Sequence, residues 1–122
     1  MKTYRELIAW QKGIELVLLA YKITRKFPKK ELYALADQIK RSSVSIPSNI
    51  AEGFGRHSDN DFIRFLNISR GSLFELQTQL EISFRLDFIK SEDYEVTMQL
   101  AVEIDKMLNA LISKIKQNSS MP

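Results

Sequence analysis

The sequence predicts an all-α protein: an antiparallel, up-down-up-down four-helix bundle whose second helix is kinked at Pro47. Three observations support this prediction. Gly and Pro are scarce, at four and three residues in 122, so long uninterrupted segments remain between them. Apolar residues in those segments recur at steps of three and four, which is the period of an amphipathic helix. The segments are joined by short turns, which place successive helices antiparallel.

Composition indicates a single domain, which we expect to span residues 1–118 with a frayed tail at 119–122. With 44 % hydrophobic residues the chain can fill one core, and with no cysteine it has no disulfide or thiolate chemistry. The N-terminal segment is interrupted by Lys12 and Glu15, so it fits neither a signal peptide nor a membrane span. We therefore expect a soluble, cytoplasmic protein without a membrane partner.

The first helix is expected to begin near Tyr4, because Thr3 and Glu6 have the spacing of a capping box. It should end near Lys26, because Pro28 disfavours helical backbone at the residue before it. Its apolar residues form two rows, which is wider than one partner helix needs and suggests a deep core or a subunit contact. The rows are Leu7, Trp10, Ile14, Val17, Leu18 and Tyr21, and beside them Ile8, Leu16, Leu19 and Ile23.

The second helix is expected over roughly 29–55, with Pro28 suited to its first turn. Its apolar stripe keeps the same phase on both sides of Pro47, so the helix should pass through the proline. A proline inside a helix costs about 3 kcal/mol, and the hydroxyls of nearby serines can bond to freed backbone groups. Gly53 and Gly55 end the helix.

The third helix should start at Ser58, whose side chain can cap it, and should continue to about Leu86. Gly71 and Ser72 in its middle would let another helix approach closely. Ser91 caps the fourth helix, whose apolar residues follow a heptad-like step until it frays from Gln117 onward.

Positive charge is concentrated in the first half of the chain, which suggests a surface for phosphates. Residues 1–60 carry eleven basic and six acidic residues, whereas residues 61–122 carry seven and nine. The basic residues can bind nucleic acid or can simply keep a connecting segment soluble. The candidate nucleic-acid-binding residues are Lys22, Arg25, Lys26, Lys29, Lys30, Lys40 and Arg41.

No catalytic, cofactor or metal site is predicted. His57, the only histidine, lies in a polar turn without the Glu-x-x-His pattern of di-iron bundles. Polar residues on or beside the core faces suggest a hydrogen-bonded network in which Arg41, or the carbonyls freed by Pro47, satisfy Glu52 or Glu75. The less favoured alternative is that Glu52 and Glu75 form a proton-transfer pair. The network residues are Gln38, Asn49, Glu52, Ser72 and Glu75, with Gln79 nearby.

The aromatic residues occur at helical spacing, which favours a place in the core over a base-stacking role. They are Trp10, Tyr21, Phe27, Tyr33, Phe62 and Phe65.

Several motifs resemble the four-helix-bundle proteins encoded in intervening sequences of bacterial 23S rRNA genes, a family that includes the accessory protein of diversity-generating retroelements. They are Trp10-Gln11-Lys12, Phe27-Pro28-x-x-Glu31, Leu35-x-x-Gln38-Ile39-x-Arg41, SIPSNIAEG at 45–53 and Gly71-Ser72-x-x-Glu75-Leu76-x-x-Gln79-Leu80. One departure is Asp87, where the pattern leads us to expect glycine in the third turn.

The resemblance implies a homopentameric ring and an association with structured RNA or a nucleic-acid enzyme such as a reverse transcriptase. It transfers no catalytic residue and no cofactor. The functional hypothesis is thus a non-enzymatic oligomeric scaffold that binds RNA or such an enzyme. The alternative is a protein–protein adaptor with no nucleic-acid role.

Overall fold

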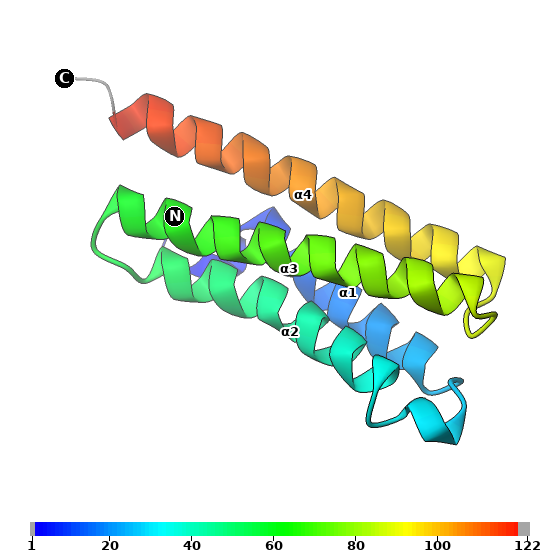
Figure 1. Cartoon of the computed structure of the whole chain (residues 1–122). Helices are drawn as coiled ribbons and strands as arrows, with labels where there is room; N and C mark the ends of the chain where they lie inside the picture. Colours follow the sequence, from blue (N-terminus) through cyan, green and yellow to red (C-terminus); the bar gives the residue numbers. More distant parts are fainter. Residues whose placement is uncertain (1, 120–122) are drawn as a thin grey trace.

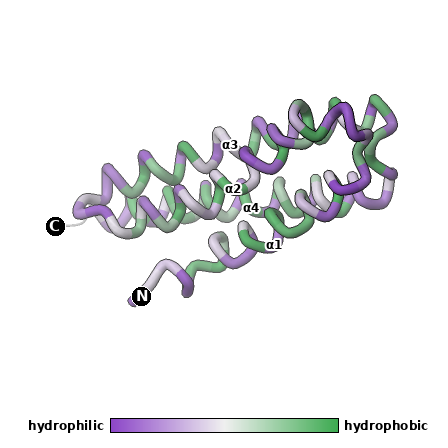
Figure 2. The backbone as a smooth tube through the Cα atoms, turned by 90° about the horizontal axis from the view of Figure 1, so that it is seen from below, coloured by the Kyte–Doolittle hydropathy of each residue, from purple (hydrophilic) through white to green (hydrophobic). Residues whose placement is uncertain are grey.

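The computed structural model describes residues 2–119, and these form an all-α four-helix bundle, as predicted (Figure 1). The long helices are α1 (Ile8–Thr24), α2 (Leu35–Phe54), α3 (Asp59–Arg85) and α4 (Ser91–Ser119). Two short 3-10 helices, η1 (Tyr4–Glu6) and η2 (Lys29–Glu31), precede α1 and α2. Along the tube, hydrophobic and hydrophilic stretches alternate every few residues, as amphipathic helices require (Figure 2).

Each helix packs against two neighbouring helices, and among residues 2–119 no Cα atoms of the diagonal pairs, α1 with α3 and α2 with α4, come within 8 Å of each other. The α2–α3 pair is the most extensive contact and the α1–α4 pair the least. The connections α1–α2 and α3–α4 lie at the same end of the bundle, as antiparallel helices demand (Figure 1). The fully buried large side chains come from all four helices and include Leu16, Ile39, Ile46, Ile50, Leu66, Leu73, Leu76, Leu80, Ile104 and Leu108.

The helix α2 passes through Pro47 without interruption, which confirms the prediction from the apolar phase. Hydroxyl and amide groups around the proline donate to neighbouring carbonyls: Ser48 Oγ to Val44 O at 2.7 Å and Asn49 Nδ2 to Ser45 O at 2.8 Å. From α3, the buried Ser69 hydroxyl donates to the Ile46 carbonyl at 2.9 Å. Polar contacts within α2 and across to α3 therefore support the helix at its weakest point.

Three predicted helix ends were wrong. The α-helix α1 begins at Ile8, not near Tyr4, because the Thr3 hydroxyl accepts from Arg5 N at 3.3 Å and caps the short η1 instead. The helix α2 begins at Leu35, not near residue 29, because Pro28 opens η2 and a turn follows it. The helix α4 remains helical from Gln117 through Ser119, where fraying was expected; the rest of the expected tail, 120–122, lies outside the described residues.

The third turn ends α3 in a tight reversal. Asp87 has a positive φ of 65°, its N–H donates to Phe84 O at 3.0 Å, and Phe88 N–H donates to Ser83 O at 2.9 Å. These two bonds form the Schellman arrangement, in which the left-handed position is most often glycine. The expectation of glycine at this position therefore has a physical basis, and aspartate occupies a conformation that suits glycine better.

The inward face of α1 differs from the predicted one. Small residues dominate it: Ala9, Gly13 and Ala20 are buried together with Leu16 and Ile23. By contrast, Ile8, Ile14, Leu18 and Tyr21 are exposed, with Leu18 at 65 %. The small buried residues let this face of α1 lie close to its neighbours and turn inward. The larger apolar residues on the rest of the wide apolar face therefore remain on the outside of the bundle.

Candidate nucleic-acid interface

The connection between α1 and α2, residues 25–34, is anchored to the bundle by an aromatic contact. Phe27 is buried, and its ring lies 5.5 Å from the ring of Phe88 in the α3–α4 connection. Backbone hydrogen bonds from Glu31 N to Pro28 O (2.9 Å) and from Ala34 N to Glu31 O (3.2 Å) hold the residues that follow. The connection lies at one end of the bundle, held by this aromatic contact and these hydrogen bonds (Figure 1).

Five of the seven predicted cations surround this connection, and all five are exposed. Lys26 Nζ lies 3.7 Å from Asp93 Oδ2 at the start of α4. Among residues 2–119 no carboxylate forms an ion pair with the other four. They are Lys22, Arg25, Lys29 and Lys30.

The remaining two cations lie further along α2, in the groove against α1. Lys40 Nζ lies 5.6 Å from the centre of the Tyr21 ring, and Arg41 Nε lies 2.9 Å from Asp37 Oδ2 one turn earlier. The two cations and Tyr21 line a surface hollow of about 420 Å³. Because each of them already has an aromatic or acidic partner, they are less available to phosphates than the cations of the connection.

Two aromatic residues lie where the spacing did not predict them. Tyr33 is 95 % exposed in the turn between η2 and α2, so its expected place in the core is wrong. Tyr21 is also exposed, at 41 %, whereas Phe27 and Phe65 are buried and Trp10 and Phe62 are half-buried. The helix that was expected to bury Tyr33 begins two residues after it, so the residue lies in a turn without a buried face.

Only part of the predicted polar network forms. Ser45 Oγ lies 2.8 Å from Ser72 Oγ and accepts from Asn49 Nδ2 at 2.9 Å, so Asn49 and Ser72 join through a serine that the prediction had not assigned to the network. The i, i+3 placement of Ser69 and Ser72 on the apolar face of α3 was the signal that could have found this contact between helices.

The charged members of that network and Gln38 are on the surface instead. Gln38, Glu52 and Glu75 are exposed, Glu52 Oε1 accepts from Arg56 at 2.6 Å, and Arg41 is engaged by Asp37. Because these side chains remain in contact with water, the acids need no buried partner.

The structure does not bring the two acids of the alternative proton-transfer pair together. Two contacts show how α2 and α3 are aligned. Gly53 packs against Phe65 near the α2–α3 turn, and Ser45 faces Ser72 further from that turn. Glu52 is next to Gly53 at the first contact, whereas Glu75 lies beyond the second contact, further from the turn. His57 is exposed in the α2–α3 turn, and among residues 2–119 no three His, Asp or Glu side chains gather as a metal site would require.

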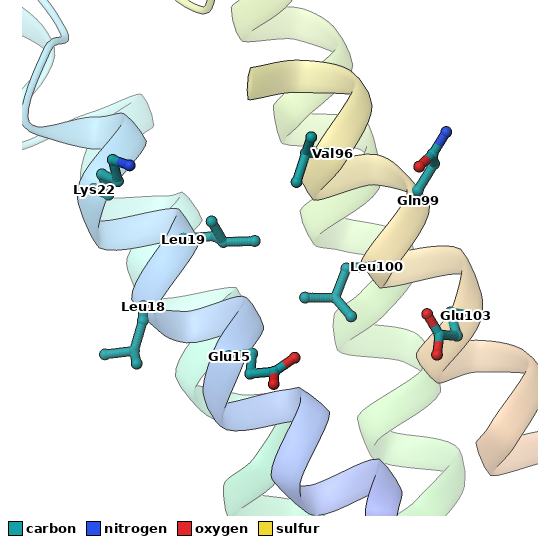
Figure 3. A pocket seen from close by; sticks show the side chains of 8 residues that line it. All are labelled: Glu15, Leu18, Leu19, Lys22, Val96, Gln99, Leu100 and Glu103. Carbon is teal, nitrogen blue, oxygen red and sulfur yellow. The ribbon is translucent and has the colours of Figure 1, made fainter. Parts of the chain in front are cut away.

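A second surface feature is an apolar groove between α1 and α4, the pair of helices that pack least closely (Figure 3). Its volume is about 530 Å³. Leu19 and Leu100 point toward each other across the groove, while Leu18 points away from α4 on the outer side of α1 (Figure 3). The remaining lining residues are Glu15, Lys22, Val96, Gln99 and Glu103.

An ion pair closes one end of this groove. Lys12 Nζ lies 2.8 Å from Glu103 Oε1, and that hydrogen bond together with the carboxylate charge raises the pKa of Lys12 above its ordinary value.

None of the helices between residues 2 and 119 has a stretch long and apolar enough to cross a membrane.

A family model described as 23S rRNA-intervening sequence protein matches residues 5–110. The chain belongs to this family. The match covers the whole bundle from η1 to the last third of α4, so the basic connection and the apolar groove both lie inside the region that the family shares. It confirms the family to which the sequence motifs pointed.

A crystal structure has the same fold. It is that of a protein with unknown function from the S23 ribosomal protein family of Bacteroides thetaiotaomicron VPI-5482, with a TM-score of 0.81 and 29 % sequence identity. The likeness covers 87 % of this chain and 96 % of that one. Among curated proteins, no sequence matches this chain.

Proposed function

We propose that this 23S rRNA-intervening sequence protein is a non-enzymatic, oligomeric scaffold that binds structured RNA through the basic residues around the α1–α2 connection. One observation carries the proposal. Lys22, Arg25, Lys29 and Lys30 are exposed at one end of the bundle, and no described carboxylate pairs with them. Cations that are not neutralised within the protein are free to replace the counterions of a phosphate backbone.

The test is RNA binding by the whole chain as a function of salt. Each phosphate contact contributes a slope of about −0.7 to −0.9 to the plot of log K against log salt. A variant with Gln at Lys22, Arg25, Lys26, Lys29 and Lys30 should bind a folded RNA more weakly and with a flatter slope. The matched control carries Gln at Lys106, Lys114 and Lys116, which are exposed cations on α4.

Two results would contradict RNA binding at this surface. One is the absence of any binding by the unmodified chain at low salt. The other is an equal loss of affinity in the control variant, because the positive charge of the whole chain rather than the connection would then be responsible. Circular dichroism of each variant checks that the bundle still folds.

The scaffold is proposed to be a homo-oligomer, with five subunits as the number that the family resemblance implies. Support comes from the outer face of α1, where Ile14, Leu18 and Tyr21 are exposed at i, i+4 and i+7 beside the apolar groove. Monomeric proteins rarely leave so continuous an apolar surface in water. Copies packed through this face would bury it.

Light scattering tests the oligomer. The unmodified chain should have about five times the 14.2 kDa mass of one chain. A Leu18→Glu variant should dissociate, because a carboxylate in a subunit contact is costly to bury. The Ile82→Glu variant, on the exposed face of α3, is the control and should keep the mass of the unmodified chain. A monomeric unmodified chain at micromolar concentration would contradict this part of the proposal.

The protein partner proposed for the scaffold is a nucleic-acid-handling enzyme such as a reverse transcriptase. A second candidate function is a protein–protein adaptor without RNA, and the apolar α1–α4 groove is the observation that favours it. Capture of a protein partner that survives nuclease treatment and is lost in Leu18→Glu, together with no RNA binding by the unmodified chain at low salt, would support the adaptor and contradict the RNA scaffold.

A further inference from the structure

Tyr33 is the most exposed of the large apolar side chains on this surface, at 95 %. Burial of an aromatic ring is a large source of folding stability, and this ring contributes almost none. The fold therefore gives no reason for an aromatic residue at this position. A ligand that covers the ring would give one.

The backbone beneath Tyr33 is held on both sides. Before it, Phe27 is buried against Phe88, and the turn is closed by the hydrogen bond from Leu32 N to Lys29 O at 3.2 Å. After it, Ala36 is buried in the first turn of α2. Because the backbone on both sides is hydrogen-bonded or packed, a ligand that stacks on the ring has to order the Tyr33 side chain and not the whole connection, so binding costs less entropy.

The surroundings of the ring are cationic. Residues 25–34 contain four basic residues and a single acidic one, Glu31. Lys29 and Lys30 lie in the 3-10 turn just before Tyr33 and are exposed without a described ion pair. A flat ring beside free ammonium groups suits a nucleotide, whose base stacks on the ring while its phosphate meets the charge.

The ring also selects among forms of RNA. In a duplex each base is stacked on its neighbours and presents no free face, and double-stranded RNA is recognised mainly by its shape and backbone. Unpaired bases in bulges and loops can be splayed out and stacked on aromatic side chains. The other exposed tyrosine is less suited, because Lys40 already lies over the Tyr21 ring at 5.6 Å.

We infer that Tyr33 stacks on an unpaired base of the bound RNA while Lys29 and Lys30 hold the adjacent phosphates. The inference rests on the proposed RNA binding and adds its ligand: bulged or looped nucleotides rather than continuous duplex. A protein partner is disfavoured at this point because, within residues 25–34, Leu32 is the only other exposed large apolar residue, whereas four residues are basic.

The test compares two RNA probes with the full-length protein: a blunt RNA duplex, and the same duplex interrupted by a bulge of unpaired adenosines. One bulged adenosine is replaced by 2-aminopurine, whose fluorescence is quenched when it stacks. Affinities come from fluorescence anisotropy, with the variants compared at the same salt concentration and each measurement repeated over a series of salt concentrations. Base–aromatic stacking predicts a loss of about 5- to 150-fold for Tyr33→Ala on the bulged probe, with duplex affinity unchanged.

Matched variants separate the ring from the charges. Tyr33→Phe should keep both the affinity and the quenching, because it keeps the ring. Lys29→Ala with Lys30→Ala should lower the affinity for both probes and flatten the salt dependence. Lys114→Ala with Lys116→Ala, at the opposite end of α4, should change neither.

Several outcomes overturn the inference. Equal affinity of the unmodified chain for the two probes, or full affinity of Tyr33→Ala for the bulged probe, removes the stacking role while leaving the proposed RNA binding in place. A change of subunit number in Tyr33→Ala, seen by light scattering, assigns the ring to a subunit contact instead. Failure of the unmodified chain to bind either probe at low salt overturns the inference and the proposed function together.

Discussion

Gly13 of α1 lies directly against the ring of Pro47 in α2. A Cβ atom built on Gly13 would come within 3.2 Å of Pro47 Cβ and 3.5 Å of Pro47 Cδ. The proline inside α2 is thus packed by the residue of α1 that has no side chain. Close approach of the two helices buries the proline ring and offsets part of the cost of the lost backbone hydrogen bond.

Replacing Gly13 with Val should destabilise the bundle by about 1–3 kcal/mol, because the added methyl groups meet a rigid ring that cannot move aside. The matched control is Gly71→Val on α3, where a Cβ would meet nothing within 4 Å. That variant should keep or slightly raise stability, since glycine is a poor helix former. Urea unfolding followed by circular dichroism measures both. Equal stability of the two variants would refute close packing at Pro47.

The buried hydroxyl of Ser69 should be worth about 1 kcal/mol through its hydrogen bond to the Ile46 carbonyl. Ser69→Ala removes that donor next to Pro47, so its free energy of unfolding should fall by this amount. Thr78→Ala is the control, because Thr78 is an exposed α3 residue whose hydroxyl bonds only within its own helix. If the free energy of unfolding fell more in Thr78→Ala than in Ser69→Ala, the hydrogen bond between α2 and α3 would not be the source of the stability that Ser69 adds.

Replacing Asp87 with glycine should make the protein more stable. At a φ of 65° the Asp87 backbone is in the left-handed region, where a Cβ atom crowds the backbone, and Asp87→Gly should raise the free energy of unfolding by up to about 1 kcal/mol. Asp87→Val should lower it by more than that, because a β-branched residue tolerates this conformation least. Thermal unfolding of the two variants gives the comparison. A stabilising valine would mean that the turn has a different backbone in solution.

The contact between Tyr94 and Glu81 should make stability depend on pH. The Tyr94 hydroxyl donates to Glu81 Oε1 at 2.5 Å, and Arg85 Nε donates to Glu81 Oε2 at 2.8 Å. These two hydrogen bonds, together with the Arg85 charge, lower the pKa of Glu81. The stabilisation from a carboxylate with a lowered pKa is present above the ordinary value near 4.5. It is lost as pH falls through the lower folded-state pKa.

Tyr94→Phe keeps the stacking on Phe84, at 4.2 Å between ring centres, and removes the hydroxyl. We therefore expect the variant to be less stable than the unmodified chain at pH 7, with the difference shrinking as pH falls below about 4.5. Urea unfolding across that range measures it. The hydrogen bond to Glu81, with burial second, raises the pKa of Tyr94, so the same difference should also shrink as pH rises above 10. A constant difference from pH 3 to pH 7 would exclude the coupling.

Some elements followed from the sequence because they depend on local chemistry. The cap at Ser58 is local: its hydroxyl accepts from Asp61 N at 3.1 Å, as its spacing predicted. The passage of α2 through Pro47 was visible in the apolar phase, and the glycine expected at Asp87 corresponds to a left-handed backbone position. The five basic residues around the connection are neighbours in the chain, so their clustering was also visible.

The rest depended on which helix faces meet, and periodicity alone does not decide that. A pattern of threes and fours marks Leu18 and Leu16 alike as apolar, yet only the close approach at Gly13 and Pro47 fixes which row of α1 turns inward. Tyr33 fitted a helical period, but the tertiary structure leaves it in a turn and exposes its ring. The four helices and their order can be predicted from the residues alone, because they follow from hydrogen bonding and burial along one chain. Which apolar and aromatic side chains remain in water depends on how the helices pack, because the volume available between them sets that choice.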